Sequence, residues 1–301
     1  MSGSAVLEAT GPAAVAEAAP RRRLRLPFNP WHLFLFPLTV VMLFPMLWMV
    51  VTSLESITEA RHFPPILIPS SLHFENYPNA LHTAPFGAFF LNSTIVSVSV
   101  VAANLLFCSL AGYAFARIRF RGSNLIFVFL LATLMIPSQV TIIPQFLIVK
   151  WLGEHVTHSI GVDSLGALIV PDSVQVFAIF MLRQFFRTLP VELEEAARID
   201  GTSRLGVLVK IVLPLSLPAL STLAALLFLY EWNDFLWPLI ALQSTQHYTI
   251  QVGLAFFQGA HNTAWTRLMA ANMMSMIPLL VVFFAAQKYF VRSVATSGLK
   301  G

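Results

Sequence analysis

The sequence has little charge: only 11% of its residues are Asp, Glu, Lys or Arg, whereas a typical soluble domain has roughly 25%. Apolar residues make up 57% of the chain, and its mean hydropathy is +0.75. A soluble core does not need this composition, so we expect the solvent around most of the chain to be a lipid bilayer. The net charge of +4 therefore does not indicate a nucleic-acid partner.

The sequence also lacks the residues and motifs that several kinds of functional site require. The single cysteine, Cys108, lies in an apolar run and has no partner for an internal disulfide. The eight histidines are scattered, without an H-E-x-x-H motif or cysteines beside them, so we expect no metal site. There is no G-x-S-x-G turn and no G-x-x-x-x-G-K-[ST] loop, which excludes a typical serine nucleophile and an ATP site on this chain. We expect neither a catalytic site nor a bound cofactor, and hence no enzyme.

The apolar residues form runs long enough to cross a bilayer, which takes about 20 residues for a core of about 30 Å. Many of these runs contain proline, which is tolerated in a membrane bundle because neighbouring helices satisfy the freed carbonyls. The fourth run is the least regular because it contains Asp172 and Gln175. We predict an all-α protein with a disordered cytoplasmic tail at 1–30 and a transmembrane domain at 31–301. The six predicted spans are 32–54, 89–112, 124–146, 166–186, 208–230 and 268–290.

The basic residues predict the orientation of these spans, because cytoplasmic loops carry an excess of Lys and Arg. If the N-terminus is cytoplasmic, fifteen of the eighteen Lys and Arg residues are cytoplasmic, and only Arg61, Lys150 and Arg267 are external. This asymmetry predicts that both termini face the cytoplasm. It also places the charged stretch between the fourth and fifth spans on the cytoplasmic side.

That charged stretch predicts a short amphipathic helix at 189–201. Pro190 suits the first helical position, Gly201 is placed as a stop, and Thr202 or Ser203 as the cap of the following helix. Leu189, Leu193, Ala196 and Ala197 share one face. An interfacial helix on lipid headgroups is one interpretation, but such helices favour Lys and Arg on the polar face, whereas this one has three glutamates. Docking into a groove of another protein is the alternative.

The residues of this stretch resemble the EAA motif of ABC importer permeases. Glu195-Ala196-Ala197 is followed after three residues by Gly201 and after nine more by Ile211-Val212-Leu213-Pro214. Three further segments are similar to the maltose-type sugar-importer permeases, in particular to the six-span G-type subunit: 111–117 (AGYAFAR), 135–144 (MIPSQVTIIP) and 232–239 (WNDFLWPL). The resemblance covers about residues 30–301.

This resemblance implies the ABC type I importer permease fold and a multi-pass location in the inner membrane of a prokaryote. It also implies a coupling helix near 190–205 that inserts into a cytoplasmic ATPase subunit, which binds the ATP and Mg²⁺. The implied partners are a second, related permease, two ATPase copies, an extracytoplasmic solute-binding protein and a sugar. The implied coupling residues are Glu194, Glu195, Ala196, Ala197, Asp200, Gly201, Leu213 and Pro214.

Polar side chains at membrane depth are candidates for the wall of a water-filled pathway. An uncharged conduit with aromatic residues suits a polyhydroxylated solute, but Ser, Thr and Asn also bond packed helices together, so both interpretations stay open. The candidates are Asn92, Ser93, Ser97, Asn104, Gln139, Glu231, Asn233, Asp234, Asn272 and Ser275.

Three other functions compete with the sugar importer. A permease for another solute class shares all the features above. A stand-alone secondary transporter needs a buried ionisable residue and an internal repeat; Asp172 is the one candidate residue, and we find no convincing repeat. A membrane scaffold without transport leaves the coupling motif unexplained.

Overall fold

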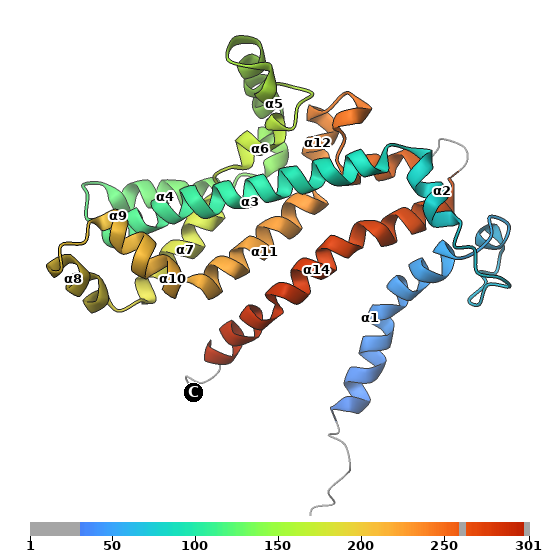
Figure 1. The fold of residues 1–301 in the computed structure, drawn as a ribbon, viewed down its shortest axis with the longest axis horizontal. Coiled ribbons are helices and arrows are strands. Elements are labelled where there is room, and N and C mark those ends of the chain that lie inside the picture. The colour runs from blue at the N-terminus through green and yellow to red at the C-terminus, as the bar shows by residue number, and fades with distance from the viewer. Residues whose placement is uncertain (1–30, 259–262, 298–301) are drawn as a thin grey trace, which may run out of the picture. The chain divides into compact units, whose positions relative to one another are not determined.

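The computed structural model describes residues 31–258 and 263–297 (Figure 1). The predicted tail at 1–30 lies outside the described residues. Contacts divide the chain into two units, residues 1–45 and 46–301, and the description below concerns the second unit unless stated. All regular elements in the described part are helical, with one isolated bridge between Gln258 and Thr263. The α-helices are α1 His32–Ser53, α2 Asn76–Thr83, α3 Phe86–Arg117, α4 Ser123–Thr133, α5 Ser138–His155, α6 Gly166–Asp172, α7 Val176–Thr188, α8 Val191–Ile199, α9 Arg204–Val207, α10 Leu213–Leu215, α11 Leu217–Asn233, α12 Leu236–Ala241, α13 Ile250–Leu254 and α14 Trp265–Ser297.

The six predicted spans correspond to three long helices and three bent pairs. The helices α1, α3 and α14 are each long and apolar enough to cross a membrane. The pairs α4 with α5, α6 with α7, and α9–α10 with α11 meet the same criterion when each pair counts as one span. The all-α fold class is therefore confirmed, with six spans in the described residues if each bent pair crosses once.

The breaks in the three pairs occur where proline or polar residues interrupt the apolar runs. The third predicted span is not one straight helix: α4 and α5 meet at 101°, and Pro137 stands directly before α5. Proline has no N–H to continue the hydrogen bonds of a preceding helix. The fourth span bends by 41° between Asp172 and Val176. The fifth bends by 79° at Ser216, between Pro214 and Pro218 and just after a π-helical turn at Leu208–Val212.

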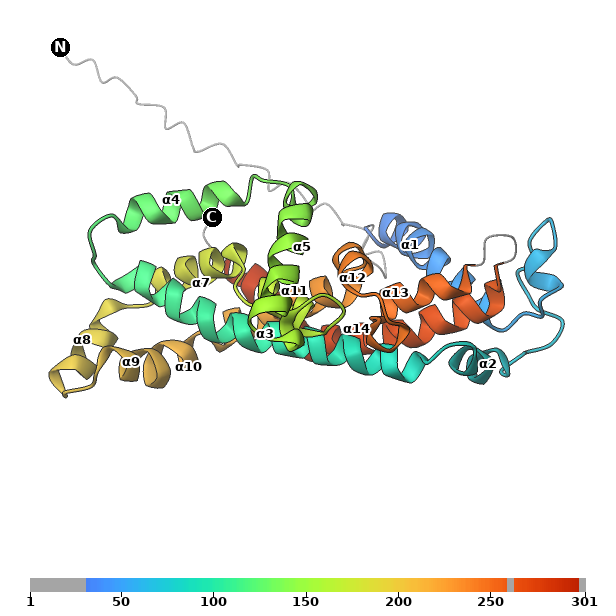
Figure 2. The same ribbon diagram turned by 90° about the horizontal axis from the view of Figure 1, so that it is seen from above.

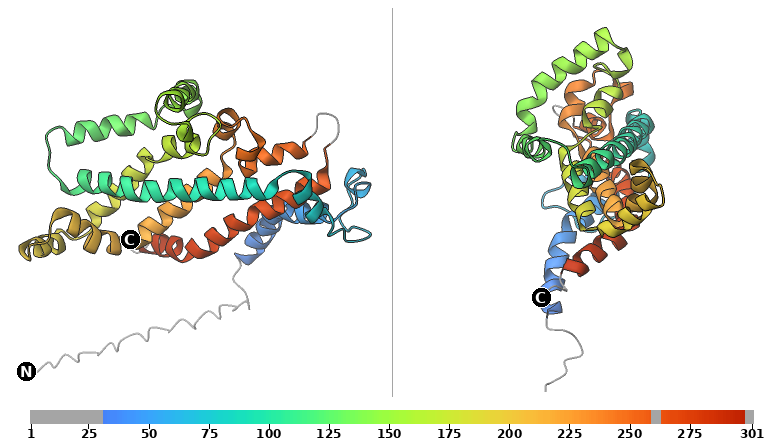
Figure 3. Two further views of the ribbon diagram at one scale, coloured as in Figure 1. Left: turned by 45° about the horizontal axis from the view of Figure 1, so that its top comes forward. Right: turned by 90° about the vertical axis from the view of Figure 1, so that its left-hand side faces the viewer.

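Helix α3 is the centre of the second unit and packs most extensively against α7 and α11. The helices α3, α11 and α14 follow one another side by side in Figures 1 and 3. Gly112 allows α3 to approach α7 closely, because it has no side chain. A Cβ at this position would lie only 3.2 Å from the backbone nitrogen of Arg183. With 32 residues, α3 is about 48 Å long, which exceeds a hydrocarbon core of about 30 Å. Helix α3 is therefore longer than one crossing requires, and Figure 2 shows α8, α9 and α10 near its C-terminal end.

Candidate coupling site

Helix α8 confirms the predicted short helix between the fourth and fifth spans, and its ends follow the local sequence. It runs from Val191 to Ile199, with Pro190 as the residue before it instead of the first helical residue. It stops in a Schellman arrangement, in which the Gly201 N–H donates to the Arg198 carbonyl (3.1 Å) and the Thr202 N–H to the Ala197 carbonyl (2.9 Å). Gly201 has a φ of +82°, which glycine adopts without steric cost. Ser203 caps the next helix by accepting from the Gly206 N–H at 3.2 Å.

The side chains of α8 are distributed in an unusual way: an acid is buried and the aliphatic residues are exposed. Glu194 is 7% exposed, whereas Ile199 is 85% exposed and Val191 and Leu193 are also exposed. The four residues of the predicted apolar face divide into two pairs. Leu189 and Ala197 pack against the buried core cluster, whereas Leu193 and Ala196 are exposed. An exposed apolar face on a short helix is typical of a surface that another protein covers.

Glu194 is buried because α3 supplies its partners. The Nε of Arg117 lies 2.7 Å from Oε1 of Glu194, and the Tyr113 hydroxyl donates to Oε2 at 3.1 Å. The Nη2 of Arg117 also donates to the Leu189 carbonyl at 2.6 Å, so one guanidinium holds both the acid of α8 and the chain entering α8. A buried charge is tolerated when it is paired in this way.

The other predicted coupling residues lie in two places. Glu195, Asp200 and Gly201 are exposed, on or just after α8. Leu213 packs against the buried core cluster with Leu189 and Ala197, whereas Pro214 is exposed. The sequence missed Arg117 as the partner of Glu194, although it is the last residue of the quoted AGYAFAR segment.

The predicted pathway residues on α3 serve mainly as ties to irregular backbone. Asn92 donates to the carbonyls of Gln246 (2.8 Å) and Tyr248 (3.0 Å), and the Ser93 hydroxyl accepts from the Ile250 N–H at 2.8 Å. Ser97 is fully buried. These contacts fix the chain before α13 onto α3, since backbone groups inside a membrane protein need partners.

Asn104 does the same for the break between α6 and α7. Its Nδ2 donates to the Asp172 carbonyl at 2.6 Å, and its Oδ1 accepts from the Gln175 N–H at 2.8 Å. The Gln175 side chain in turn donates to Oε1 of Glu231 at 3.0 Å. Asp234 directly follows α11 and is half-buried. The structure thus links the predicted pathway residue Asn104 on α3 to Glu231 near the end of α11 through Gln175.

The remaining candidates are divided between the surface and the contact of α11 with α14. The Ser275 hydroxyl donates to the Asn272 carbonyl (2.8 Å), and the Ser275 carbonyl accepts from the Trp232 indole at 3.1 Å. Gln139 and Asn233 are exposed. Asn233 bonds within α11 and accepts from Gln251 at 3.5 Å.

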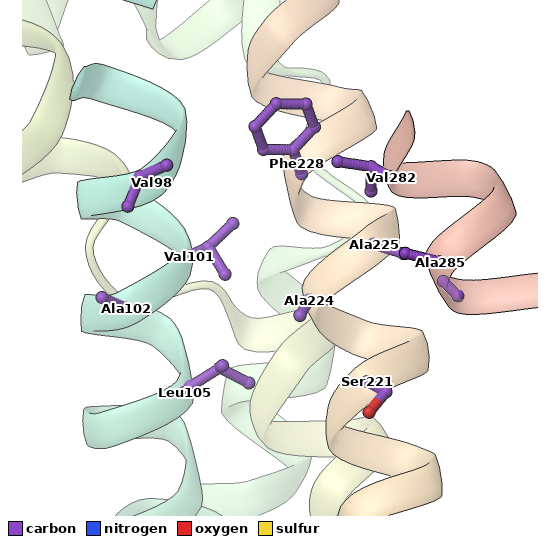
Figure 4. Close-up of a pocket in the computed structure, with 11 residues that line it drawn as sticks. Val98, Val101, Ala102, Leu105, Ser221, Ala224, Ala225, Phe228, Val282 and Ala285 are labelled. Atoms are coloured by element: carbon purple, nitrogen blue, oxygen red, sulfur yellow. The ribbon is translucent and has the colours of Figure 1, made fainter. Parts of the chain in front are cut away.

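One cavity in the described residues is apolar and does not suit a sugar. It has a volume of about 470 Å³ and is formed by Phe228 and by small and aliphatic side chains of α3, α11 and α14, with Ser221 as its one polar residue (Figure 4). None of the ten predicted pathway residues lines it. A sugar site needs several convergent polar groups, so this groove is a surface for apolar atoms.

Comparisons with known proteins agree on one family. Residues 104–296 match the family described as binding-protein-dependent transport system inner membrane component. The chain is 34% identical over 286 residues to the arabinooligosaccharides transport system permease protein AraQ of Halalkalibacterium halodurans, covering 93% of this chain and 100% of the relative. It is 35% identical to the trehalose/maltose transport system permease protein MalG of Thermococcus litoralis, covering 88% and 94%. A chain of a bacterial ABC transporter involved in the import of the acidic polysaccharide alginate superimposes with a TM-score of 0.76 at 26% identity, covering 86% and 94%.

Proposed function

The chain belongs to the family of binding-protein-dependent transport system inner membrane components, and on this premise we propose that it forms half of the translocation pathway of an ATP-driven sugar importer. It is the permease subunit, a membrane component and not the catalytic one. The observation that carries the residue-level proposal is the arrangement of α8, whose aliphatic side chains are exposed while its Glu194 is tied to α3.

The proposed complex contains a second related permease, two copies of a cytoplasmic ATPase that bind ATP and Mg²⁺, and an extracytoplasmic solute-binding protein. Both termini and α8 face the cytoplasm in this proposal, supported by the fifteen-to-three distribution of Lys and Arg. The relatives named above handle arabinooligosaccharides and trehalose or maltose, which supports a saccharide as the solute class. A permease for another solute class is the alternative, supported by a relative at 34% identity, the sn-glycerol-3-phosphate permease UgpE of Pectobacterium atrosepticum.

In this mechanism α8 transmits movement of the ATPase to the spans. The exposed side chains of Val191, Leu193 and Ile199 provide apolar contact area for the ATPase. Arg117 links α8 to the end of α3 by side-chain contacts, so a displacement of α8 pulls on α3. Because α3 packs along α7 and α11, the pull is passed to the helices beside the pathway. Two ATPase copies closing on ATP would move two such α8 helices together.

Gln139, Asn233 and Asp234 remain the best candidates for contact with the solute or the binding protein. Gln139 and Asn233 are exposed and Asp234 is half-buried, whereas Asn92, Ser93, Asn104 and Ser275 have backbone partners within this chain. A pathway shared with a second permease needs polar groups that are accessible at its surface.

Co-purification tests this proposal. The chain is tagged at its C-terminus, extracted in mild detergent, and the proteins that come with it are identified. We expect a second permease and an ATPase with a phosphate-binding loop, with the ATPase lost in Glu195→Ala and Gly201→Asp variants. A chain that purifies alone and transports solute in ATP-free vesicles would contradict the proposal and favour secondary transport.

A further inference from the structure

A small cavity lies where the end of α1 and the chain after it meet the start of α14. Its volume is about 160 Å³, below the ~300–1,000 Å³ typical of small-molecule pockets, so it suits a group of side-chain size. Two indoles and two carboxylates are among the residues that line it. The full lining is Trp48, Thr52, Glu55, Glu59, Ala60, His62, Pro65, Ile66, Trp265 and Met269.

Glu55 is the unusual residue in this cavity, because its charge is buried without a partner for one oxygen. It is 2% exposed, and in the described part of the chain no hydrogen bond of normal geometry reaches its Oε1. Burial and the nearby Glu59 carboxylate raise the pKa of Glu55, partly offset by the Thr52 hydroxyl. Its backbone is held in place, since the Asn76 side chain donates to the carbonyls of Ser53 (3.0 Å) and Glu55 (2.9 Å). A buried carboxylate held this firmly calls for a cation.

Glu59 adds a second, permanent negative charge. Its Oε1 accepts from the Ser70 hydroxyl (2.5 Å) and N–H (2.9 Å), and its Oε2 from the Ser56 hydroxyl (2.8 Å) and N–H (3.0 Å). These bonds, led by the Ser70 hydroxyl, lower the pKa of Glu59 to about 2, so it is ionised at neutral pH. Because its oxygens are already engaged, Glu59 contributes charge to the cavity and leaves direct contact to Glu55.

The aromatic residues favour the same kind of ligand. Indole faces attract ammonium and guanidinium groups by cation–π interaction, and both Trp48 and Trp265 line the cavity. The one basic side chain among the lining residues is His62, whose Nδ1 pairs with the Pro64 carbonyl at 2.9 Å. Arg61 lines a separate, smaller cavity with Trp265. The described lining therefore combines two carboxylates and two indoles with no lysine or arginine, which suits a cation better than a sugar.

The surroundings of the cavity suit a protein as the source of this cation. Residues on the same connection, among them Phe63 and Ile68, are 90% and 83% exposed. Large apolar side chains exposed around a buried polar centre are typical of a protein–protein interface. Arginine in a desolvated, aromatic-lined pocket is a common binding hot spot.

We propose that this cavity receives a Lys or Arg side chain of the extracytoplasmic solute-binding protein. The inference rests on the proposed function, which places the end of α1 on the external side. It goes beyond that function by naming the docking residue, Glu55, and the chemistry of its partner.

The first test measures docking of the binding protein to the complete transporter in bilayer nanodiscs, with Glu55→Gln beside the wild type. The matched control is Glu154→Gln, which removes an exposed carboxylate that pairs with Lys150 at 3.9 Å. We expect Glu55→Gln to weaken docking at least tenfold at low salt, and by a smaller factor at high salt. We also expect it to raise the midpoint of thermal unfolding of the undocked transporter, because an unpaired buried charge is gone. The control should leave docking unchanged.

Glu55→Gln is expected to lower the docking affinity and to raise the thermal stability. These opposite changes distinguish a docking role of Glu55 from a structural one. Docking of Glu55→Gln as tight as that of the wild type overturns the inference alone. A variant that docks weakly and also unfolds at lower temperature assigns Glu55 a structural role, which overturns it too. Failure of the wild type to bind any binding protein contradicts the proposed function itself.

A second arm identifies the ligand chemistry. Ethylguanidinium at millimolar concentration should compete with docking to the wild type and not change the weaker docking of Glu55→Gln. Charge reversal should also be rescuable: Glu55→Lys should bind again to a binding protein in which one interface Lys or Arg is changed to Glu. The inference would be overturned if maltose, and not ethylguanidinium, competed with docking. It would also be overturned if no Lys or Arg to Glu change in the binding protein restored docking of Glu55→Lys.

Discussion

Two acidic side chains, Glu194 and Asp163, each hold two segments of the chain together, and they do so with different kinds of partner. Glu194 ties α8 to α3 through the side chains of Arg117 and Tyr113. Asp163, in the connection before α6, accepts from the backbone N–H groups of Gln243 (2.9 Å) and Ser244 (2.8 Å) and from the Ser244 hydroxyl. His247 lies 3.3 Å from the same carboxylate.

The two kinds of partner constrain the two segments in different ways. Backbone amides define the shape of a loop, so Asp163 fixes the conformation of the chain after α12. Side-chain contacts fix a position while leaving the helix itself intact, so Arg117 and Glu194 hold α8 as a unit that can be pushed or pulled. The comparison therefore separates a loop held in one shape from a helix that, in our proposal, transmits force.

The largest effect should come from breaking the contact between α8 and α3. Arg117→Ala leaves Glu194 buried without its cation, which costs ~3–5 kcal/mol, and also removes the bond to the Leu189 carbonyl. We expect solute uptake in proteoliposomes to fall at least tenfold, because α8 no longer holds α3. The matched control is Arg119→Ala, which removes an exposed arginine two residues later and should transport normally. Normal uptake by Arg117→Ala would contradict the proposal that this contact links α8 to α3 during transport.

The Asp163 loop should respond in stability more than in coupling. Asp163→Ala removes an acceptor shared by three donors, and charge-assisted bonds are each worth ~1.5–3 kcal/mol. We expect the variant to unfold at lower temperature while its remaining transport stays tied to ATP hydrolysis. Thermal unfolding and the ratio of ATP hydrolysed to solute imported measure the two properties. A raised ratio would show that this loop also takes part in coupling.

The same carboxyl predicts an acid dependence of stability. Although burial opposes the change, bonds from Ser244, Gln243 and His247 lower the pKa of Asp163 from 3.8 to about 2. The unfolded state therefore binds more protons between these values, and about 2 kcal/mol of stability is present above pH ~4 and lost as the pH falls toward 2. Unfolding of Asp163→Asn should lack this part of the acid dependence. Identical acid profiles for the two proteins would refute the assignment.

A smaller effect on stability is expected at Gly201, with a clear effect on transport. Gly201→Asp puts a side chain on a residue with a φ of +82°, which costs about 1 kcal/mol, so folding and membrane insertion should survive. The new charge lies beside the exposed face of α8 and should uncouple ATP hydrolysis from uptake. Gly122→Asp is the matched control, since Gly122 also has a φ of +82° but lies before α4. Normal uptake by Gly201→Asp would count against α8 as the coupling helix.

The features that the sequence predicted well are those determined by neighbouring residues. The spans follow from apolar runs, and the bounds of α8 follow from Pro190 and Gly201. The EAA spacing coincides with α8 and the turn that follows it. Ser203, one of two candidates, is the cap of the following helix.

The features that it did not predict depend on residues far apart in the chain. Glu194 was expected to contact the ATPase, but Arg117, 77 positions earlier, holds it inside, and no periodicity in α8 contains this information. The choice between pathway and helix contact for Asn92 and Asn104 stayed open for the same reason. The broken backbone at 172–176 and 246–250 provides their partners, and the breaks themselves are tertiary features.

The most direct test of the central claim is a charge swap between α3 and α8. ATP-driven uptake is measured in proteoliposomes for Arg117→Glu, for Glu194→Arg and for the double variant, with assembly of the ATPase checked in each. The account predicts little uptake by either single variant and substantial recovery by the double variant, because the ion pair is restored with its charges exchanged. Single variants that transport like the wild type would contradict the claim that this ion pair carries force from α8 to the spans.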